Sequence, residues 1–465
     1  MAAAGVMQAK GSATGRRRDL HPKPIFDEPS LRSFLVGHGV KPVHMGKIWK
    51  HVLSNLHEGA QLPRLDDVPG IPDRIRKALA EEYAVITSSL VKMSVSEIDG
   101  TMKLLVRLQD GGEVEAVVIH HSGEAEHPDQ RQADRCGERD TLCVSSQVGC
   151  RLGCTFCATG TMGLQGNLWP GEIQEQLVHA QMQKGHANSI LNVVFMGMGE
   201  PLENYDAVSS AIRGLVDPFR FGLAPSSVTV STVGSSPRNM QRLLEELPKI
   251  KLAVSLHAPN QALREQLVPA AKILPIGKLL ALVDEHSQRT TGESKRQRMV
   301  MVSYVLLKGV NDSLEQAREL AELLKGRSVI VNLIPYNPFE GNVHEYEEPS
   351  PKDVDDFLKV LAQGEVRVFE RRHHGRDIAA ACGQLAKLNG TAESTRDQLD
   401  IESCSCTLNK DLRKRGLLEQ KEEWLGQHLA KSTWKHAGLA TVTAALVGLA
   451  AVGAVQAFSW RRRAR

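Results

Sequence analysis

The chain has 465 residues, of which 42% are hydrophobic, so it is long enough for two or three domains with a sizeable core. Its formal net charge of +3 excludes a uniformly basic surface and leaves only a local patch for binding nucleic acid. Eight cysteines are too few for a secreted disulfide scaffold of this length, and the sequence has no secretory signal peptide. We therefore expect an intracellular, cytoplasmic protein whose clustered cysteines bind metal or perform chemistry.

The N-terminal quarter predicts a tail followed by a small accessory domain. Residues 1–24 are mostly small or basic, which indicates a disordered tail, with a short organelle transit peptide as the alternative. Apolar residues recur at helical spacing in 31–40 and 45–56, and they alternate with polar residues around a Gly-Gly turn in 103–121. We therefore expect helices and a β-hairpin in an accessory domain over 25–121.

The middle of the chain alternates strands and helices. A polar segment over 122–140 is expected to be an exposed loop, with Cys136 as an incidental thiol. The predicted strands that follow cover 142–148, 190–197, 227–233, 251–257, 299–307, 328–335 and, last, 365–370. Strands rich in β-branched residues that alternate with amphipathic helices are typical of a parallel sheet. We expect an α/β core over 141–388, built as a partial (β/α)6 barrel, short of the eight units of a closed one.

The C-terminal part departs from this pattern. Residues 389–436 form a polar extension that contains Cys404 and Cys406, for which the sequence indicates no role. The run 437–460 has no charged residue and is followed by three arginines. At about 1.5 Å rise per residue, a helix of this length spans a bilayer of about 30 Å. We predict a transmembrane tail anchor that attaches the protein to a membrane, with an Ala-rich helix packed on a partner as the alternative.

Four cysteines lie close together at the start of the core. Cys150, Cys154 and Cys157 have the spacing C-x3-C-x2-C, and Cys143 precedes them. Three thiolates on one loop suit an iron–sulfur cluster, because soft sulfur ligands favour iron in that form. Zinc is the competing metal, but a structural zinc site needs four ligands and no second C-x2-C pair follows. Three ligands on a four-iron cluster leave one iron open, which usually indicates chemistry.

Glycines and polar residues end the predicted core strands. Ligands of a β/α barrel gather at the carboxyl ends of its strands. Besides the cysteine loop, these ends carry Gly199, Glu200, Ser231, Ser255, Leu256, His257 and Asn332. A glycine lets the backbone approach a ligand closely, and a carboxylate can bind an ammonium group or ribose hydroxyls. The sequence therefore predicts a ligand site at this end of the barrel.

Several segments together resemble a known family. The cysteine loop, with Phe156 before its last cysteine, resembles the signature of radical S-adenosylmethionine (SAM) enzymes. The whole set is similar to the RlmN/Cfr family of RNA adenine methyltransferases: CVSSQVGC (143–150), VVFMGMGEPL (193–202), SLHAPN (255–260), NLIPYNPF (332–339) and RDIAAACGQL (376–385). The resemblance extends from Phe26 to Leu388 and implies a radical SAM barrel with a small N-terminal helical and hairpin domain.

The resemblance implies the cofactors and their ligands. A [4Fe–4S] cluster would be held by Cys150, Cys154 and Cys157, and an electron donor such as flavodoxin or ferredoxin would reduce it. Two SAM molecules would be used per turnover. SAM contacts are implied for the strand-end residues Gly199, Glu200, Ser231, Ser255, Leu256, His257 and Asn332.

The resemblance also implies a two-cysteine mechanism. Carbon 2 of adenine is electron-poor and cannot attack the methyl group of SAM, so family members first load a methyl group onto a cysteine, which matches Cys382. A second SAM yields a radical that activates this methyl group for addition to adenine. A second thiol, matching Cys143, attacks the sulfur and frees the product by forming a disulfide. Glu115 matches the base that removes the proton from carbon 2, with a solvated strand carboxylate as the alternative interpretation.

The implied substrate is an RNA loop, because a target base must leave its stack to reach the site. The CGQL context favours the carbon-2 branch, which acts on large-subunit rRNA and tRNA anticodon loops, over the carbon-8 Cfr branch. Basic segments 371–374 and 295–298 are candidates for phosphate contacts. A non-catalytic iron–sulfur module and a radical SAM enzyme for a small molecule are the alternatives, but neither needs Cys143 and Cys382. We expect a monomer.

Overall fold

The computed structural model describes residues 20–56, 62–121, 139–184, 190–289, 299–371 and 373–385. Most of the predicted tail and loop and the whole C-terminal extension, with Cys136, Cys404 and Cys406, lie outside these residues. Among the described residues, no helix is both long and apolar enough to cross a membrane. The predicted span over 437–460 falls in the part that is not described, so it stays a prediction.

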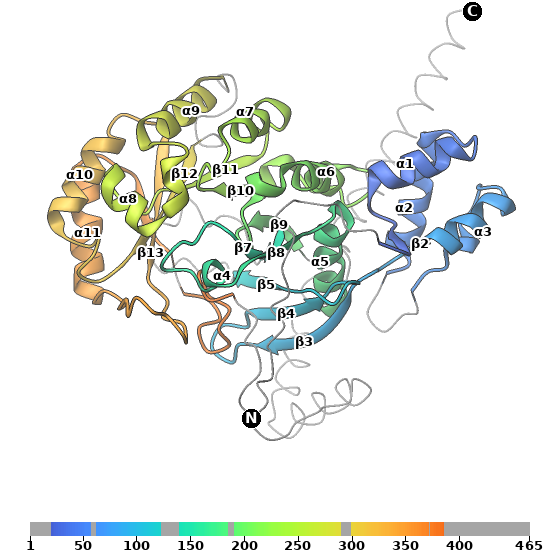
Figure 1. The fold of residues 1–465 in the computed structure, drawn as a ribbon, viewed down its shortest axis with the longest axis horizontal. Helices are drawn as coiled ribbons and strands as arrows, with labels where there is room; N and C mark the ends of the chain where they lie inside the picture. The colour runs from blue at the N-terminus through green and yellow to red at the C-terminus, as the bar shows by residue number, and fades with distance from the viewer. Residues whose placement is uncertain are drawn as a thin grey trace, which may run out of the picture. The chain divides into compact units, whose positions relative to one another are not determined.

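The N-terminal part forms the expected helices and hairpin (Figure 1). The helices are α1 (Glu28–Gly37), α2 (Met45–Ser54) and α3 (Asp73–Glu82), and the short strands β1 (Lys23–Pro24) and β2 (Tyr83–Ala84) pair beside them. The hairpin consists of β4 (Met102–Arg107) and β5 (Glu113–His121). A further strand that the sequence pattern did not predict, β3 (Ser89–Val95), lies at the edge of the sheet, pairs antiparallel with β4 and is largely exposed. Its apolar residues do not alternate with polar ones in the usual half-buried pattern.

One ten-stranded sheet joins this hairpin to the core, in the order β14-β13-β12-β11-β10-β9-β6-β5-β4-β3. Its parallel strands are β6 (Arg139–Cys143), β9 (Ile190–Phe195), β10 (Val228–Thr232), β11 (Lys251–Ser255), β12 (Val300–Leu306), β13 (Val329–Pro335) and β14 (Val368–Glu370). Strand β5 pairs antiparallel with β6, so the accessory hairpin extends the barrel sheet instead of forming a separate one.

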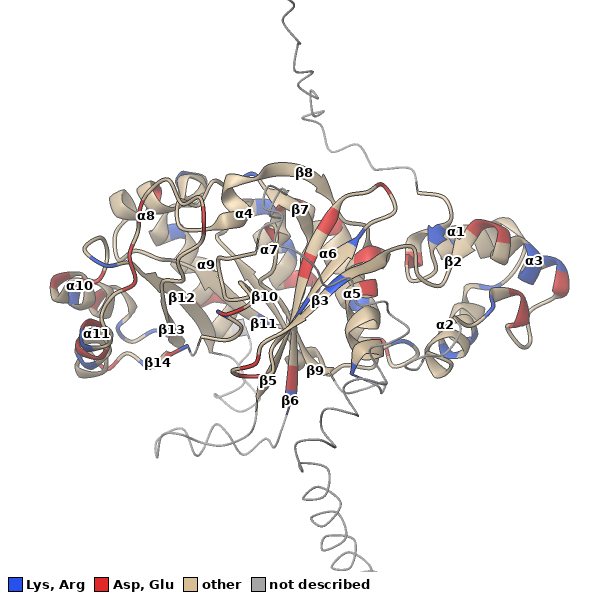
Figure 2. Cartoon of the chain, turned by 90° about the horizontal axis from the view of Figure 1, so that it is seen from below, with Lys and Arg blue, Asp and Glu red and all other residues tan. Residues whose placement is uncertain are grey.

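Helices on the outer side of the sheet connect the parallel strands (Figure 1). They are α5 (Pro170–Gln183), α6 (Tyr205–Val216), α7 (Pro237–Glu246), α9 (Ile276–Arg289), α10 (Leu314–Leu324) and α11 (Pro351–Gln363). The short helix α8 (Gln261–Leu267) instead lies beside the cysteine loop, where Thr155 N–H donates to Leu267 O at 3.0 Å. Capping residues fix where several of them begin: Ser313 and Ser350 form capping boxes, and Ser236 accepts from the N–H of Asn239. Figure 2 shows charges of both signs on α3, α10 and α11, in keeping with the near-zero net charge.

The predicted first core strand, 142–148, is wrong in its bounds. Strand β6 ends at Cys143, although the chain continues along β9, with Val144 N–H donating to Val194 O at 2.9 Å. After Ser146 it leaves the main sheet and forms β7 (Gln147–Cys150), which pairs with β8 (Gly163–Asn167) in a separate hairpin. The apolar pattern runs through both strands, so it did not reveal where the backbone changes partners.

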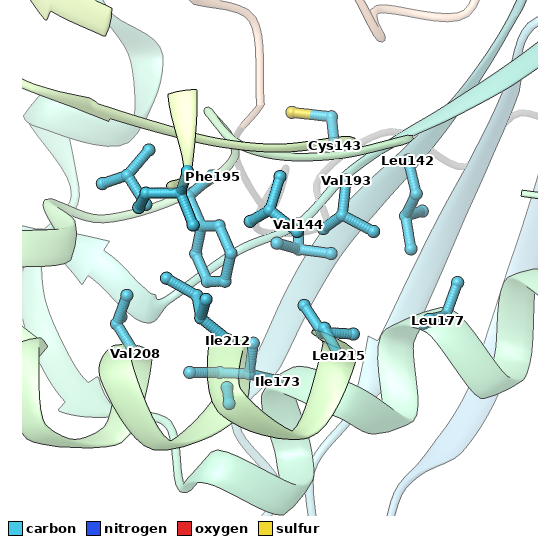
Figure 3. Packing of buried hydrophobic residues seen from close by; sticks show 14 of the residues in the cluster. Leu142, Cys143, Val144, Ile173, Leu177, Val193, Phe195, Val208, Ile212 and Leu215 are labelled. Carbon is cyan, nitrogen blue, oxygen red and sulfur yellow. The ribbon is translucent and has the colours of Figure 1, made fainter. Parts of the chain in front are cut away.

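The core between the sheet and the outer helices is continuous and apolar (Figure 3). Phe195 on β9 packs against Ile212 and Ile173 of α6 and α5, and its side chain is 2% exposed. Leu191, near the start of the same strand, is 51% exposed. The strand therefore offers a buried and an exposed apolar residue for comparison.

We expect Phe195→Ala to lower the free energy of unfolding by about 3–5 kcal/mol, because it removes a buried ring and leaves a cavity. Leu191→Ala is the matched control and should change it by less than about 1 kcal/mol. Urea denaturation followed by circular dichroism measures both. Equal effects of the two substitutions would show that the core does not extend as described.

Buried polar contacts fix the chain between β2 and β3 to α5. The Glu175 carboxylate accepts from the N–H groups of Thr87 at 3.0 Å and Ser88 at 2.9 Å, and Ser88 Oγ lies 3.0 Å from His179 Nε2. Burial lowers the pKa of His179 to about 4. This histidine is therefore neutral in the folded protein near pH 7.

His179 should make stability depend on pH. Its folded-state pKa lies below the ordinary value of about 6.5, so its contribution is present above pH 6.5 and is lost as the pH falls towards 4. Relative to His179→Gln, the wild-type protein should lose up to about 3 kcal/mol over this interval. Parallel urea titrations at pH 7.5, 6 and 5 test this expectation. A difference between the two proteins that stays constant with pH would contradict it.

Candidate active site

The hairpin beyond Cys143 carries the three spaced cysteines. Strand β7 ends at Cys150, Cys154 lies in the following loop, and Cys157 precedes the short helix α4 (Ala158–Thr161). The Cys157 N–H donates to Cys154 O at 3.2 Å, and Gly160 N–H donates to Cys157 O at 3.0 Å. A Cβ at Gly160 would lie 2.8 Å from Cys154 O, so the tight turn that keeps Cys154 and Cys157 together requires glycine.

The three thiols are protonated in the absence of positive charge. Burial raises the pKa of Cys150 to about 12, and it raises the pKa values of Cys154 and Cys157, with the other cysteines of the loop adding to the shift for Cys154. A metal-bound thiol is deprotonated, because the metal supplies the charge that offsets burial. Three thiols on one tight loop, that of Cys150 buried and those of Cys154 and Cys157 partly buried, are thus a donor set that fits an iron–sulfur cluster.

The described residues show no preformed site for a single metal ion. Among the described residues, no three His, Cys, Asp or Glu side chains converge on one point as ligands of one ion. Structural zinc requires such convergence, with sulfur ligands at about 2.3 Å. The thiolates of a cluster bind different iron atoms and need not converge on one point. The geometry of the loop is therefore compatible with the predicted cluster.

Strand register places Glu115 and Cys143 on the same face of the sheet. Val117 of β5 is the partner of Cys143 on β6, and Glu115 lies two residues before Val117. Because side chains alternate along a strand, Glu115 and Cys143 point to the same side. Figure 3 shows the Cys143 sulfur on the side away from the helices, whereas Leu142 faces them. Both groups therefore face the interior of the open barrel, where Glu115 is 6% and Cys143 is 5% exposed.

A row of polar side chains crosses the interior face from β10 to β13. Cys143 is the partner of Val194 on β9, and Val194 is the partner of Thr229 on β10, so Ser231, two residues after Thr229, lies on the same face. Its Oγ lies 3.3 Å from Ser255 Oγ. Ser255 is the partner of Ser303, which is the partner of Asn332. Asn332 is 1% exposed, and its Oδ1 accepts no hydrogen bond within the described residues. An orphaned acceptor beside three hydroxyls is what a polar ligand such as SAM would satisfy.

Glu200 and the glycines before it are used within the protein. The Glu200 carboxylate accepts from Thr232 Oγ1 and from the N–H groups of Leu202 and Val233, and burial raises its pKa to about 7. A Cβ at Gly199 would lie 2.6 Å from Gln147 Cβ, and Gly199 has φ +98°. The predicted close approach of the backbone at Gly199 is thus to the protein's own chain. The carboxylate retains acceptor capacity for a ligand, since it can accept about four hydrogen bonds.

His257 and Leu256 form the wall behind the cysteine loop. His257 has a left-handed φ of 62°, its Nδ1 accepts from Val305 N–H at 3.0 Å, and its ring lies 4.8 Å from the Phe156 ring. Burial lowers the pKa of His257 to about 3, so the ring is neutral. Leu256 is fully buried, and its N–H donates to Ser303 O at 3.0 Å. Both residues shape the site at the predicted strand end.

The segment after β14 carries Cys382 back to the cysteine loop. Ala158 N–H donates to Gly383 O at 2.8 Å, and Asn337 Nδ2 donates to Cys382 O at 3.2 Å. Cys154, Cys157 and Cys382 pack against one apolar cluster. The structure therefore brings together two segments separated by more than two hundred residues in the sequence.

Cys143 and Cys382 lie within electrostatic range of each other. Burial raises the pKa of Cys143 to about 12, the Cys382 thiol raises it as well, and the Arg371 guanidinium lowers it. Burial and, among nearby groups, Cys382 also raise the pKa of Cys157. Both cysteines of the pair are free thiols in the structure. Cys382 is therefore close to the cysteine loop and to the second thiol.

The sequence did not predict two residues of this site, Ser303 and Lys103, and it predicted a different role for Arg371. Ser303 is a single polar residue in the apolar run of β12, and this break in the pattern could have indicated it. Lys103 forms an ion pair with Glu115 at 3.2 Å, which only the pairing of β4 with β5 reveals. Arg371, assigned to a candidate phosphate-binding segment, lines a pocket with Cys382 and Asn337. The other basic segment, 295–298, lies outside the described residues.

The open barrel with its cysteine loop defines a radical SAM enzyme. The model of the Radical SAM superfamily matches residues 144–324. A crystal structure of a radical SAM methyltransferase from Sphaerobacter thermophilus is 36% identical, with a TM-score of 0.66, over 78% of this chain and 99% of that one. The fold predicted from the motifs is thereby confirmed.

The relatives specify the family. A protein of Rhodopirellula baltica named probable dual-specificity RNA methyltransferase RlmN is 37% identical over 84% of this chain and 97% of its own length. The ribosomal RNA large subunit methyltransferase N of Nitrosopumilus maritimus is 38% identical over 69% of this chain and 87% of its own. The chain therefore belongs to the RlmN family of radical SAM methyltransferases, as its motifs suggested.

The proximity of Cys143 and Cys382 can be tested without substrate. With the cluster in place, mild oxidation by diamide should join these two thiols, and non-reducing peptide mapping should identify the pair. The reaction should be faster at pH 9 than at pH 7, because the pKa of Cys143 is raised and only its thiolate attacks. Cys382→Ser serves as the control that must abolish the cross-linked peptide. Pairing of Cys382 with any other cysteine would contradict the arrangement.

Proposed function

We propose that this protein methylates carbon 2 of an adenine in RNA, with Cys382 carrying the methyl group, Glu115 accepting a proton and Cys143 releasing the product. The observation that supports it most is the placement of Cys143 and Glu115 on one interior face, with Cys382 in electrostatic range of Cys143 and Cys157. A non-catalytic cluster protein or a radical SAM enzyme for a small molecule would need neither the thiol pair nor a carboxylate beside it.

The cofactors have candidate ligands in the site. Cys150, Cys154 and Cys157 would hold the [4Fe–4S] cluster. SAM would contact the row of Ser231, Ser255 and Asn332 together with Gly199, Glu200, Leu256 and His257. When bound, the cluster and SAM supply the methyl group and the radical chemistry that activates it, and two SAM molecules per turnover follow because these two uses are separate.

Cys382 and Glu115 act on the adenine. The Cys382 sulfur accepts the methyl group and holds it beside the cysteine loop. Formation of a carbon–carbon bond between this methyl carbon and carbon 2 breaks one C–H bond on each carbon. The radical chemistry of the bound cofactors would take the hydrogen atom of the methyl group and the remaining electron, carbon 2 loses a proton, and the RNA is left attached to Cys382 through a thioether. Glu115 accepts the proton that carbon 2 must lose, and its position on the interior face with Cys143 supports this role.

Cys143 ends the reaction. Its thiolate attacks the Cys382 sulfur, so that a disulfide forms, the carbon–sulfur bond breaks and the electron pair passes to the product carbon, which gains a proton and becomes the methyl group. An external dithiol then reduces the disulfide. Arg371 supports this step, since its charge favours the Cys143 thiolate against the effect of burial.

The substrate class follows from the chemistry and the relatives. A base can reach a buried site only when it leaves its stack, which favours an RNA loop. The names of the two relatives refer to dual-specificity RNA methylation and to large-subunit ribosomal RNA. We propose large-subunit rRNA and the tRNA anticodon loop as substrates in the cytoplasm, with a flavodoxin- or ferredoxin-like electron donor. Methylation at carbon 8 is the alternative outcome of the same site.

The decisive experiment supplies methyl-labelled SAM and a reductant to the cluster-loaded protein, with tRNA and an rRNA fragment in separate reactions. We expect labelled 2-methyladenosine in at least one RNA, measured by mass spectrometry of digested nucleosides. Cys382→Ala should retain the cluster but form neither product nor protein–RNA adduct. Label at carbon 8 would assign the Cfr activity. Cleavage of SAM without labelled RNA would refute RNA as the substrate.

The other two residues have a distinct signature. Cys143→Ala and Glu115→Gln should still methylate Cys382, because neither takes part in the first transfer. Both should accumulate RNA covalently attached to the protein. Glu115→Gln should lower product formation by at least about 100-fold, in the range expected for loss of an acid–base group, and Cys143→Ala should abolish release because it removes the nucleophile. Denaturing gels with labelled RNA measure the adduct. Release of product at the wild-type rate by either variant would exclude that residue from the proposed role.

A further inference from the structure

The β3–β4 hairpin contacts the segment that carries Cys382. Asp99, in the turn between the two strands, accepts from Gly375 N–H at 2.9 Å. Glu97 N–H donates to Asp377 Oδ2 at 3.2 Å, in the opposite direction. Lys103 Nζ, on β4, donates to Ala379 O at 3.1 Å. Three separate hydrogen bonds thus tie the β3–β4 hairpin to residues 375–379, just before Cys382.

Lys103 makes a second contact that the other two tethers lack. Its Nζ lies 3.2 Å from Glu115 Oε1, and the two side chains are 17% and 7% exposed. Register explains the contact: Lys103 is the partner of Val117 and Leu105 is the partner of Glu115, so Lys103 and Glu115 are diagonal neighbours on one face. One ammonium group therefore contacts both the Glu115 carboxylate and the backbone of the Cys382 segment.

We propose that Lys103 is a positioning residue that fixes the Glu115 carboxylate relative to the Cys382 segment, so that the base meets the adenine while it is attached to Cys382. This inference rests on the proposed function. It concerns the proton-removal step alone, because the first methyl transfer involves Cys382 and not Glu115.

Glu115 and Cys382 need a positioning residue because they lie on different parts of the chain. Glu115 belongs to a strand, whereas Cys382 belongs to a segment without regular secondary structure over residues 373–385. A displacement of about 1 Å between a catalytic group and its target can cost about 100-fold in rate. An ammonium group has three donors and can bind the carboxylate and the Ala379 carbonyl at the same time. Lys103 therefore sets a spacing that neither element sets alone.

The local backbone is shaped for this contact. Gly375 has φ +65°, and a Cβ there would lie 2.9 Å from Thr101 Cγ2 and 2.8 Å from Ala380 Cβ. Only glycine lets the segment turn so close to the β3–β4 connection. The close approach at Gly375 is to Thr101, just before β4, and the hydrogen bond to Ala379 comes from Lys103, near the start of β4. The segment is thus fitted to the hairpin over its length.

Arg107 offers a matched control because it lies on the same strand, β4, as Lys103. Arg107 of β4 forms a cross-strand ion pair with Glu113 of β5, with Nε 2.9 Å from Oε1. Arg107→Met and Lys103→Met each remove one cross-strand ion pair between β4 and β5. Only Lys103 also contacts the Cys382 segment, so a difference between the two variants reports the tether rather than the hairpin.

The test follows both steps of the reaction in cluster-loaded protein, with methyl-labelled SAM and a tRNA or rRNA fragment. Lys103→Met should methylate Cys382 as the wild type does, measured by peptide mass spectrometry. It should accumulate the protein–RNA adduct and release 2-methyladenosine about 10- to 100-fold more slowly. Lys103→Arg, which retains the donors, should recover most of this rate, and Arg107→Met should match the wild type.

Hydrogen exchange of the protein without SAM or RNA gives a second, independent measure. Residues 375–382 should exchange faster in Lys103→Met than in Arg107→Met. Product release by Lys103→Met at the wild-type rate would overturn the inference, as would loss of Cys382 methylation, which would make Lys103 merely structural. If the wild-type protein forms no RNA product, the proposed function fails, and equal exchange in the two variants would then reject the tether separately.

Discussion

Alternation of side chains along one continuous sheet is the constraint on which this site depends. The pairing of β5 with β6 is in register such that Glu115 and Cys143 face the barrel interior together. The registers of the parallel strands place Ser231 and Asn332 on that same face. A slip of one residue at any pair would turn the later residues towards the helices. The accessory hairpin is therefore part of the candidate site, because its strand β5 carries both Glu115 and the register partner of Cys143.

Burial determines the chemistry of the thiols. The cluster cysteines and Cys143 all have raised pKa values because they are removed from water. Metal binding offsets this cost for the loop cysteines, and the Arg371 charge acts in the same direction at Cys143. The Cys143 thiol is thus mostly protonated near pH 7, and it lies within electrostatic range of Cys382. Burial therefore lowers the reactivity of the Cys143 thiol, while the fold places the Cys382 thiol near it.

Several motif residues lie where the sequence predicted them, but they also make contacts within the protein that the sequence did not predict. Gly199 was expected to let the backbone approach a ligand, yet its missing Cβ makes room for Gln147. Glu200 was expected to bind an ammonium group, and its carboxylate also joins η4 (Pro201–Asn204) to the end of β10. His257 was expected near SAM, and its ring supports the cysteine loop through Phe156. These residues support the candidate ligand site through contacts with neighbouring parts of the protein. The spacing of residues in the sequence does not reveal such contacts.

The sequence by itself determined the alternation of the parallel core strands with helices, the cysteine spacing and the motifs that assign the family. Those features are local, since each depends on periodicity or on residue types within a short segment. Tertiary structure alone decided the departure of the chain from the sheet after Cys143, the position of the Cys382 segment and the contact between Lys103 and Glu115. These depend on strand register and on contacts between residues far apart in the chain. No local pattern encodes them, because the same alternation is compatible with more than one pairing partner.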